Sequence, residues 1–173
     1  MDIAVIPDDA PSAGTVAWPK GEARCALGRR GVTTNKREGD GATPVGTMAL
    51  RYVLYRPDRV TPPATRLSLR ALQPEDGWCD DPESPEYNRP VRRPFPARHE
   101  SLWRDDELYD LIVVLGWNDA PPVVARGSAI FLHVAGEGYA PTEGCVALAR
   151  PDLLRLLADC GPDDRLIVNP SRP

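Results

Sequence analysis

The sequence predicts a mainly β fold in a single domain that spans residues 1–173. Short apolar runs recur along the chain and are separated by proline, glycine and aspartate, which is the pattern of a strand meander. Only one segment, near the C-terminus, has the apolar spacing of an amphipathic helix. The length of 173 residues agrees with one domain and is sufficient for a hydrophobic core.

The first half of the chain predicts a series of short strands. Each run is apolar or alternating and is bounded by turn-forming residues. In the segment from Ala23 to Leu27 the alternation puts Cys25 on the apolar face, so we expect this cysteine inside the protein. The expected strands are Ile3–Ile6, Val16–Trp18, Arg24–Gly28, Thr47–Tyr55 and Leu67–Leu72.

The second half predicts the centre of the sheet and one helix. Leu111–Leu115 reads LIVVL, a continuous run typical of a strand buried on both faces, and Ser128–Val134 and Arg165–Val168 are further strands. A helix is expected at Pro151–Cys160, because proline suits the first turn and Gly161 with Pro162 ends it. Its apolar stripe comprises Leu153, Leu154, Leu156, Leu157 and Cys160.

Two long segments are predicted to be neither strand nor helix. Gly28–Gly46 contains five glycines among charged residues, but it has neither the Walker A spacing nor the dinucleotide fingerprint. Asp76–Pro96 is rich in proline and aspartate. Loops of this length in a compact domain often cover a functional site, although a solvated excursion is an equal alternative for each.

Composition excludes several classes of partner. The net charge is −4, from 21 basic and 25 acidic residues, and no long basic run is present, so a nucleic-acid partner is not expected. No apolar run approaches the ~20 residues of a membrane span. The four cysteines lack paired metal spacing, so no metal site is predicted. A disulfide between Cys25 and Cys79 is conceivable, but free thiols are the preferred interpretation.

His133 and Cys145 form a candidate pair of base and nucleophile. The chain has only two histidines, and Cys145 follows His133 by twelve residues in a Thr-Glu-Gly-Cys turn. A cysteine attacks as the thiolate, and a nearby imidazole can remove its proton. Gly144 and Cys145 could also present adjacent N–H groups as an oxyanion hole. The alternative is a structural histidine at a strand end and a small buried cysteine.

The late motif, together with an early turn, resembles the L,D-transpeptidase catalytic domain family. The late motif is His133 followed by Thr142-Glu143-Gly144-Cys145, and the early turn is Thr-Pro-Val-Gly at residues 43–46. The resemblance covers roughly residues 23–168. It implies a β-sandwich-like fold with one or two short helices, no metal and no cofactor.

The resemblance also implies a reaction on peptidoglycan stem peptides. Cys145 would attack the carbonyl between a diamino acid and terminal D-alanine, and the released D-alanine would leave a thioester. An amine of a neighbouring stem would then form a 3→3 cross-link. His133 would act as base and then acid, oriented by a backbone carbonyl. Gly144 and Cys145 would hold the oxyanion, and Thr142 completes the motif.

Two positions depart from the family pattern. Glu143 stands where relatives often have histidine, and a carboxylate there would oppose thiolate formation unless it points away or binds a substrate amine. Ala147 stands where many relatives have arginine, for which Arg29, Arg30 and Arg150 are possible substitutes. Hydrolysis of the same bonds, as an L,D-carboxypeptidase or endopeptidase, and a non-catalytic cell-wall binding module therefore remain alternatives.

The Asp76–Pro96 segment is predicted to cover the cleft at Cys145 as a lid. Trp78 and Tyr87 offer apolar surface, and Asp80, Asp81 and Asn88 can accept from the amino group of a diamino acid. Tyr87 and Asn88 are therefore candidate substrate-binding residues. The alternative is that the segment only packs on the edge of the sandwich.

The expected location follows from the substrate. Residues 1–14, MDIAVIPDDAPSAG, have no basic segment and no long apolar segment, so no export signal is visible in this chain. Taken literally, such a chain stays in the cytoplasm, yet a mature exported domain would have the same appearance. The resemblance implies the periplasm or cell envelope, and we expect a monomer.

Overall fold

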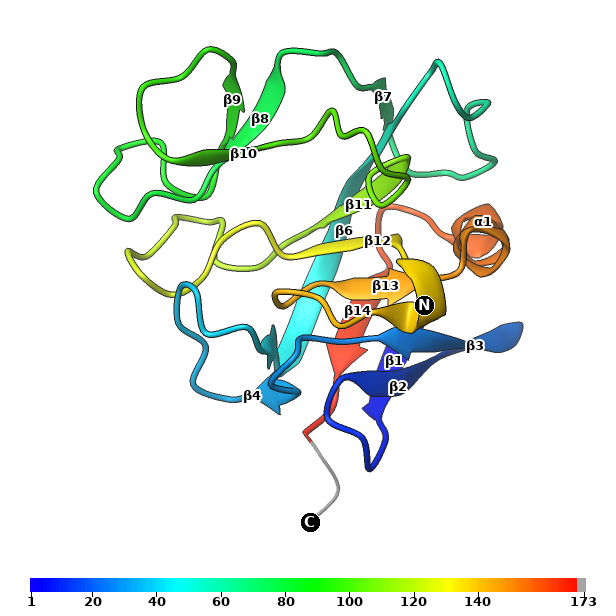
Figure 1. Ribbon diagram of the computed structural model, residues 1–173. Coiled ribbons are helices and arrows are strands. Elements are labelled where there is room, and N and C mark those ends of the chain that lie inside the picture. Colours follow the sequence, from blue (N-terminus) through cyan, green and yellow to red (C-terminus); the bar gives the residue numbers. More distant parts are fainter. Residues whose placement is uncertain (171–173) are drawn as a thin grey trace.

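A nine-stranded sheet that closes on itself is the centre of the computed structural model, which describes residues 1–170 (Figure 1). The strand order is β11-β12-β13-β3-β2-β1-β14-β6-β7, and β11 also pairs with β6, so all of these strands except β7 form a closed barrel. The mainly β prediction is confirmed. These strands are β1 (Asp2–Pro7), β2 (Ala13–Trp18), β3 (Gly21–Ala26), β6 (Gly46–Tyr55), β7 (Leu69–Ala71), β11 (Leu111–Leu115), β12 (Phe131–Val134), β13 (Val146–Leu148) and β14 (Arg165–Val168).

A second, three-stranded sheet lies beside the barrel, at the top of Figure 1. Its order is β10-β8-β9, with bounds His99–Ser101, Asp76–Cys79 and Pro90–Arg92 respectively. A two-stranded sheet of β4 (Val32–Thr33) and β5 (Thr43–Pro44) lies in the glycine-rich segment. The helices of the described residues are the short 3-10 helix η1 (Glu137–Tyr139) and α1 (Arg150–Asp159).

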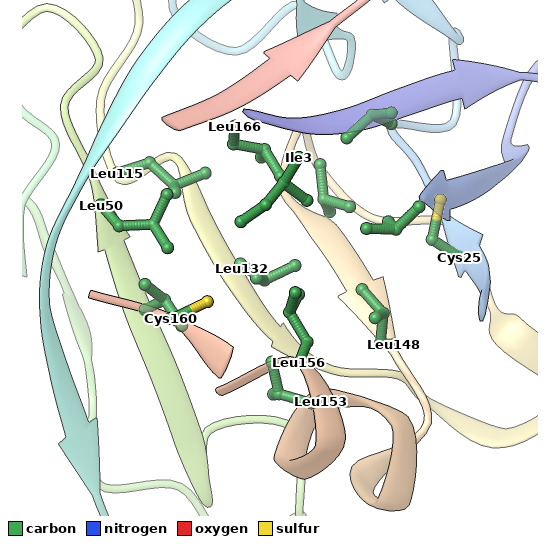
Figure 2. Packing of buried hydrophobic residues seen from close by; sticks show 14 of the residues in the cluster. Ile3, Cys25, Leu50, Leu115, Leu132, Leu148, Leu153, Leu156, Cys160 and Leu166 are labelled. Atoms are coloured by element: carbon green, nitrogen blue, oxygen red, sulfur yellow. The ribbon is translucent and has the colours of Figure 1, made fainter. Parts of the chain in front are cut away.

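The main core fills the barrel and is covered by α1 (Figure 2). Every second residue of the barrel strands points inward, so Leu132 and Leu148 meet Ile3 and Leu166 from the opposite side. Helix α1 adds Leu153, Leu156 and Leu157, all 0% exposed.

A second core separates the barrel from the three-stranded sheet. Trp78 of β8 packs edge-on against Phe131 of β12, with 5.1 Å between the ring centroids. Ile112 and Val114 of β11 face this second core, whereas Leu111, Val113 and Leu115 face the main core. β11 is therefore buried on both faces, as its apolar sequence predicted.

Most predicted elements are confirmed, with shifts of a few residues at their ends. β12 begins at Phe131 rather than Ser128, because Ala129 has a φ of 52° and interrupts the extended chain. β13 was not predicted. α1 covers Arg150–Asp159, one residue earlier than expected, and Leu154 on its predicted apolar stripe is 37% exposed. The stripe is therefore narrower than predicted.

The prediction that Asp76–Pro96 is neither strand nor helix is wrong. Both β8 and β9 lie within it, and all four residues of β8 are buried. The strand pattern of β8 was not recognised in the sequence because the strand begins with an aspartate, which is uncommon in strands. Asp76 is nevertheless 1% exposed, and it is ion-paired with Arg70 and Arg92. Gly28–Gly46 also contains short strands, β4 and β5, which corrects the same prediction there.

We predict that Leu156→Ala lowers the free energy of unfolding by about 2–5 kcal/mol, because it leaves a cavity in the main core. Leu154→Ala is the matched control, since it makes the same change in the same helix at a 37% exposed position. The control should cost less than about 1 kcal/mol. Urea unfolding of both variants measures the difference, and equal losses would contradict the packing of α1 described above.

Candidate functional site

Cys145 and His133 are brought together by the parallel pairing of β12 with β13. Leu132 pairs with Val146 and His133 with Ala147, so Cys145, which directly precedes β13, lies beside Phe131. The Phe131 N–H donates to Cys145 Sγ at 3.4 Å, in agreement with this register. Paired residues of neighbouring strands point to the same face, so Cys145 and His133 are diagonal neighbours on the face away from the barrel core.

Both side chains line one cavity of about 580 Å³. The cavity lies where the second core ends, and Cys145 and His133 are only 8% and 5% exposed. Tyr109, Ala129 and Thr142 also line it. The charged residues around the cavity are Lys36, Glu38, Asp80, Arg98, Glu100, Arg104 and Glu143.

The Cys145 thiol is held by backbone groups. It donates to the Ala129 carbonyl oxygen at 3.3 Å and accepts from the Phe131 N–H. Burial raises the pKa of Cys145 to about 12, and the carboxyl of Glu100 adds to this effect. The resting group at neutral pH is therefore the thiol and not the thiolate.

His133 is oriented by a backbone carbonyl. Its Nδ1 lies 2.8 Å from the Val134 oxygen, and because a carbonyl can only accept, Nδ1 carries the proton. Nε2 is then the ring nitrogen that can take a proton. Burial lowers the pKa of His133 to about 4, so the imidazole is neutral at neutral pH.

The turn from Thr142 to Cys145 is fixed by the Thr142 hydroxyl. This hydroxyl accepts from the Gly144 N–H at 3.1 Å and donates to the Cys145 carbonyl oxygen at 2.7 Å. Gly144 has a φ of 135°, and a Cβ there would lie 2.8 Å from the Ala42 oxygen, so the turn requires glycine. Within residues 1–170, no acceptor contacts the Cys145 N–H.

The arginine substitutes suggested by the sequence do not line the cavity. Arg29 is ion-paired with the exposed Glu143, and Arg150 pairs with Glu107 and Asp110. Arg30 also lies outside the cavity lining. The cations that do line the cavity are Lys36, Arg98 and Arg104.

Neither Tyr87 nor Asn88 lines the cavity, although Asp80 of the same segment does. Asn88 is 5% exposed and has a φ of 56°. Its Oδ1 accepts from Trp78 Nε1 and from the Ala129 N–H, both at 3.0 Å. Its Nδ2 donates to the carbonyl oxygens of residues 117 and 118. With its amide fully used, Asn88 supports Ala129, whose carbonyl holds the Cys145 thiol.

Tyr87 contacts the cavity through a carboxylate. Its hydroxyl donates to Glu38 Oε2 at 2.5 Å, and the Ser128 hydroxyl donates to the same oxygen at 2.8 Å. Burial, with the neighbouring Glu38, raises the pKa of Tyr87, so the hydroxyl remains a donor. Glu38 lines the cavity and is thus held in place by the segment that was predicted to be a lid.

Two polar residues that line the cavity with Cys145, Tyr109 and Glu100, were not predicted from the sequence. Tyr109 packs edge-on against His133 at 5.3 Å between ring centroids, and its hydroxyl donates to Glu100 Oε2 at 2.9 Å. Burial raises the pKa of Glu100 to about 7. No sequence motif marks Glu100 or Tyr109, whereas Lys36 and Glu38 lie in the glycine-rich segment, for which the sequence left a functional loop and a solvated excursion as equal alternatives.

The other thiols lie apart from this site. Cys25, Cys79 and Cys160 are buried and free, so no disulfide joins Cys25 to Cys79. Within residues 1–170, no group of three His, Cys, Asp or Glu side chains could hold a metal ion. None of the helices described there has the length and apolar character that a membrane span requires.

Comparison with known proteins identifies the family of the chain. The family model of the YkuD L,D-transpeptidase catalytic domain matches residues 11–168, nearly the whole chain. No curated protein and no solved structure matches the chain.

We predict that the free energy of unfolding of Glu100→Gln increases relative to that of the parent as pH rises from about 4.5 to 7. The folded-state pKa of about 7 lies above the ordinary 4.5, so the stability contributed by protonated Glu100 is complete below 4.5 and is lost as pH rises through 7. Glutamine does not titrate and can still accept from Tyr109. Urea unfolding at pH 4, 5.5 and 7.5 should show the difference growing by on the order of 1–3 kcal/mol. A constant difference would contradict a raised pKa of the Glu100 carboxyl.

Proposed function

The chain belongs to the L,D-transpeptidase catalytic domain family, and on that basis we propose that it is a cysteine L,D-transpeptidase acting on peptidoglycan stem peptides. The observation that carries this proposal is the pairing of Cys145 with a carbonyl-oriented His133 in one cavity. The position of the two residues, His133 on β12 and Cys145 directly before the neighbouring β13, supports the proposal that Cys145 is the nucleophile and His133 its base.

In the proposed reaction, His133 Nε2 takes the Cys145 thiol proton as Sγ attacks the carbonyl between the diamino acid and D-alanine. The C–N bond then breaks, His133 returns the proton to the leaving amine, and a thioester remains. The amine of a second stem attacks the thioester, the C–S bond breaks, and a 3→3 peptide bond forms. His133 takes the proton of this amine and returns it to the sulfur.

Cys145 and His133 are both uncharged at rest, which supports a thiol that becomes nucleophilic mainly when substrate is bound. Since the thiol pKa is about 12 and the imidazole pKa about 4, a thiolate–imidazolium pair is rare before the substrate enters. The oxyanion would accept from the Cys145 N–H. The Gly144 N–H is engaged by Thr142, so its proposed part in the oxyanion hole requires that contact to be shared.

Glu38 gives Tyr87 a role in substrate binding. Two hydroxyls hold one carboxylate oxygen, and the carboxylate lines the cavity, where an ammonium group of the diamino acid could bind. The Asp76–Pro96 segment would thus act at the cavity through Glu38 and Asp80. We place the enzyme in the cell envelope, where peptidoglycan lies, and fractionation of the native protein tests that location.

We predict that Cys145→Ala abolishes D-alanine release from a disaccharide tetrapeptide, because Cys25, Cys79 and Cys160 do not line the cavity. Cys25→Ala is the matched control and should retain activity. A carbapenem should acylate the parent on Cys145 alone, as located by peptide mass spectrometry. Undiminished release by the Cys145 variant would eliminate the mechanism.

The same time course, followed by mass spectrometry of muropeptides, separates the alternatives. Cross-linked products indicate transpeptidation, and tripeptides without cross-links indicate an L,D-carboxypeptidase. Retained binding to sacculi without any turnover would indicate a cell-wall binding module.

We predict that Tyr87→Phe raises the KM for the donor by about 3- to 30-fold with little change in kcat, since Glu38 loses one of its two donors. Glu38→Gln should shift KM in the same direction. Tyr55→Phe, on β6 outside the cavity lining, is the control and should behave like the parent. Parent-like KM values for both Tyr87→Phe and Glu38→Gln would show that this segment is only structural.

A further inference from the structure

Lys36 is a nearly buried cation beside the nucleophile. Its side chain is 4% exposed, although lysine normally keeps its ammonium group in water. It comes from the glycine-rich segment between β4 and β5 and lines the cavity that holds Cys145 and His133.

Two glycines make room for the Lys36 side chain. A Cβ at Gly144 would lie 3.3 Å from Lys36 Nζ, and a Cβ at Gly127 would lie 2.9 Å from Lys36 Cε. Both glycines have positive φ values, 135° and 90°. The ammonium group therefore packs against the backbone of the residue that directly precedes Cys145.

Asp40 fixes the position of the ammonium group. It is ion-paired with Lys36 and accepts from the N–H groups of Arg37 at 2.8 Å and Ala42 at 2.9 Å. Burial opposes ionisation of Asp40, but these contacts outweigh it, so the pKa of Asp40 is lowered. Burying a lysine is costly unless it is paired, and the ion pair with Asp40 offsets the cost of holding the Lys36 ammonium group next to the turn.

The other charges around the cavity do not offer Cys145 equivalent support. Arg98 and Arg104 are ion-paired with Asp80 and Asp106, and their side chains are 59% and 37% exposed against 4% for Lys36, so water screens their charges more strongly. Glu38, Glu100 and Glu143 are acidic. The two remaining titratable groups, His133 and Tyr109, are neutral at neutral pH, since burial lowers the pKa of the first and raises that of the second.

We propose that Lys36 is the electrostatic partner of Cys145, stabilising the negative charge that forms on Sγ when the thiol loses its proton. The need for such a partner is clear from the surroundings: the thiol is buried, carboxyl groups lie nearby, and the Gly144 N–H is taken by Thr142. Glu100 and Glu143 raise the pKa of Cys145, whereas the charge of Lys36 lowers it. In the reaction that we propose above, the same charge also acts on the oxyanion.

The inference rests on the proposed function only for the identity of the substrate, so its test uses none. The rate of Cys145 alkylation by iodoacetamide, measured from pH 6 to 10 and located by peptide mass spectrometry, reports the ionisation of the thiol directly. Lys36→Met removes the charge but keeps the length of the side chain. Asp40→Asn removes the carboxylate that partly neutralises Lys36.

The two variants should shift the pKa of the Cys145 thiol in opposite directions. We expect Lys36→Met to slow alkylation at pH 7.5 by about 3- to 10-fold and to shift the pH profile upward. Asp40→Asn should accelerate alkylation by about 2- to 5-fold and shift the profile downward. Urea unfolding confirms that both variants fold.

A merely structural ion pair would give a different result. Loss of either partner would then loosen the same loop, and both variants would change alkylation in the same direction or not at all. Either outcome overturns the proposal. Opposite shifts together with absent muropeptide turnover would leave Lys36 as the partner of the thiol and refute only the proposed reaction.

Discussion

The parallel pairing of β12 with β13 is the contact on which the site depends. Parallel neighbours cannot be joined by a tight turn, so residues 135–145 must cross from the end of one strand to the start of the other. That crossover contains η1 and ends in the turn that presents Cys145. Because the register is fixed by buried residues on both faces, the separation between the sulfur and the imidazole is fixed as well.

Burial on the outer face of these strands determines the chemistry of the pair. The three-stranded sheet covers β11 and β12 through Trp78 and Phe131, which removes water from Cys145 and His133. The same desolvation that raises one pKa lowers the other, so the pair rests as neutral thiol and neutral imidazole. Charge can then form only where the protein compensates it, which is why the position of Lys36 matters.

Loops rich in glycine and proline support the site rather than merely enclosing it. Asn88 holds the backbone at Ala129, and Ala129 in turn accepts from the Cys145 thiol. Tyr87 and Ser128 hold Glu38 from two directions. Positive φ values at Asn88 and Ala129 show that these contacts sustain uncommon backbone conformations. Hydrogen bonds between loops that are distant in sequence therefore hold the wall of the cavity in place.

The sequence by itself determined the mainly β fold, the doubly buried β11, helix α1 and the family motif at His133 and Cys145. These features depend on local periodicity and short spacing, which the chain displays directly. Only the tertiary structure decided that the sheet closes through β6 and β11 and that Asp76 begins a buried strand. It also decided that Lys36, Glu38, Glu100 and Tyr109 line the same cavity as the Cys145 thiol. These residues lie far from Cys145 in sequence and are brought to the cavity by the pairing of distant strands. No local sequence pattern encodes which residues meet there, so none encodes the burial or the charge of the cavity.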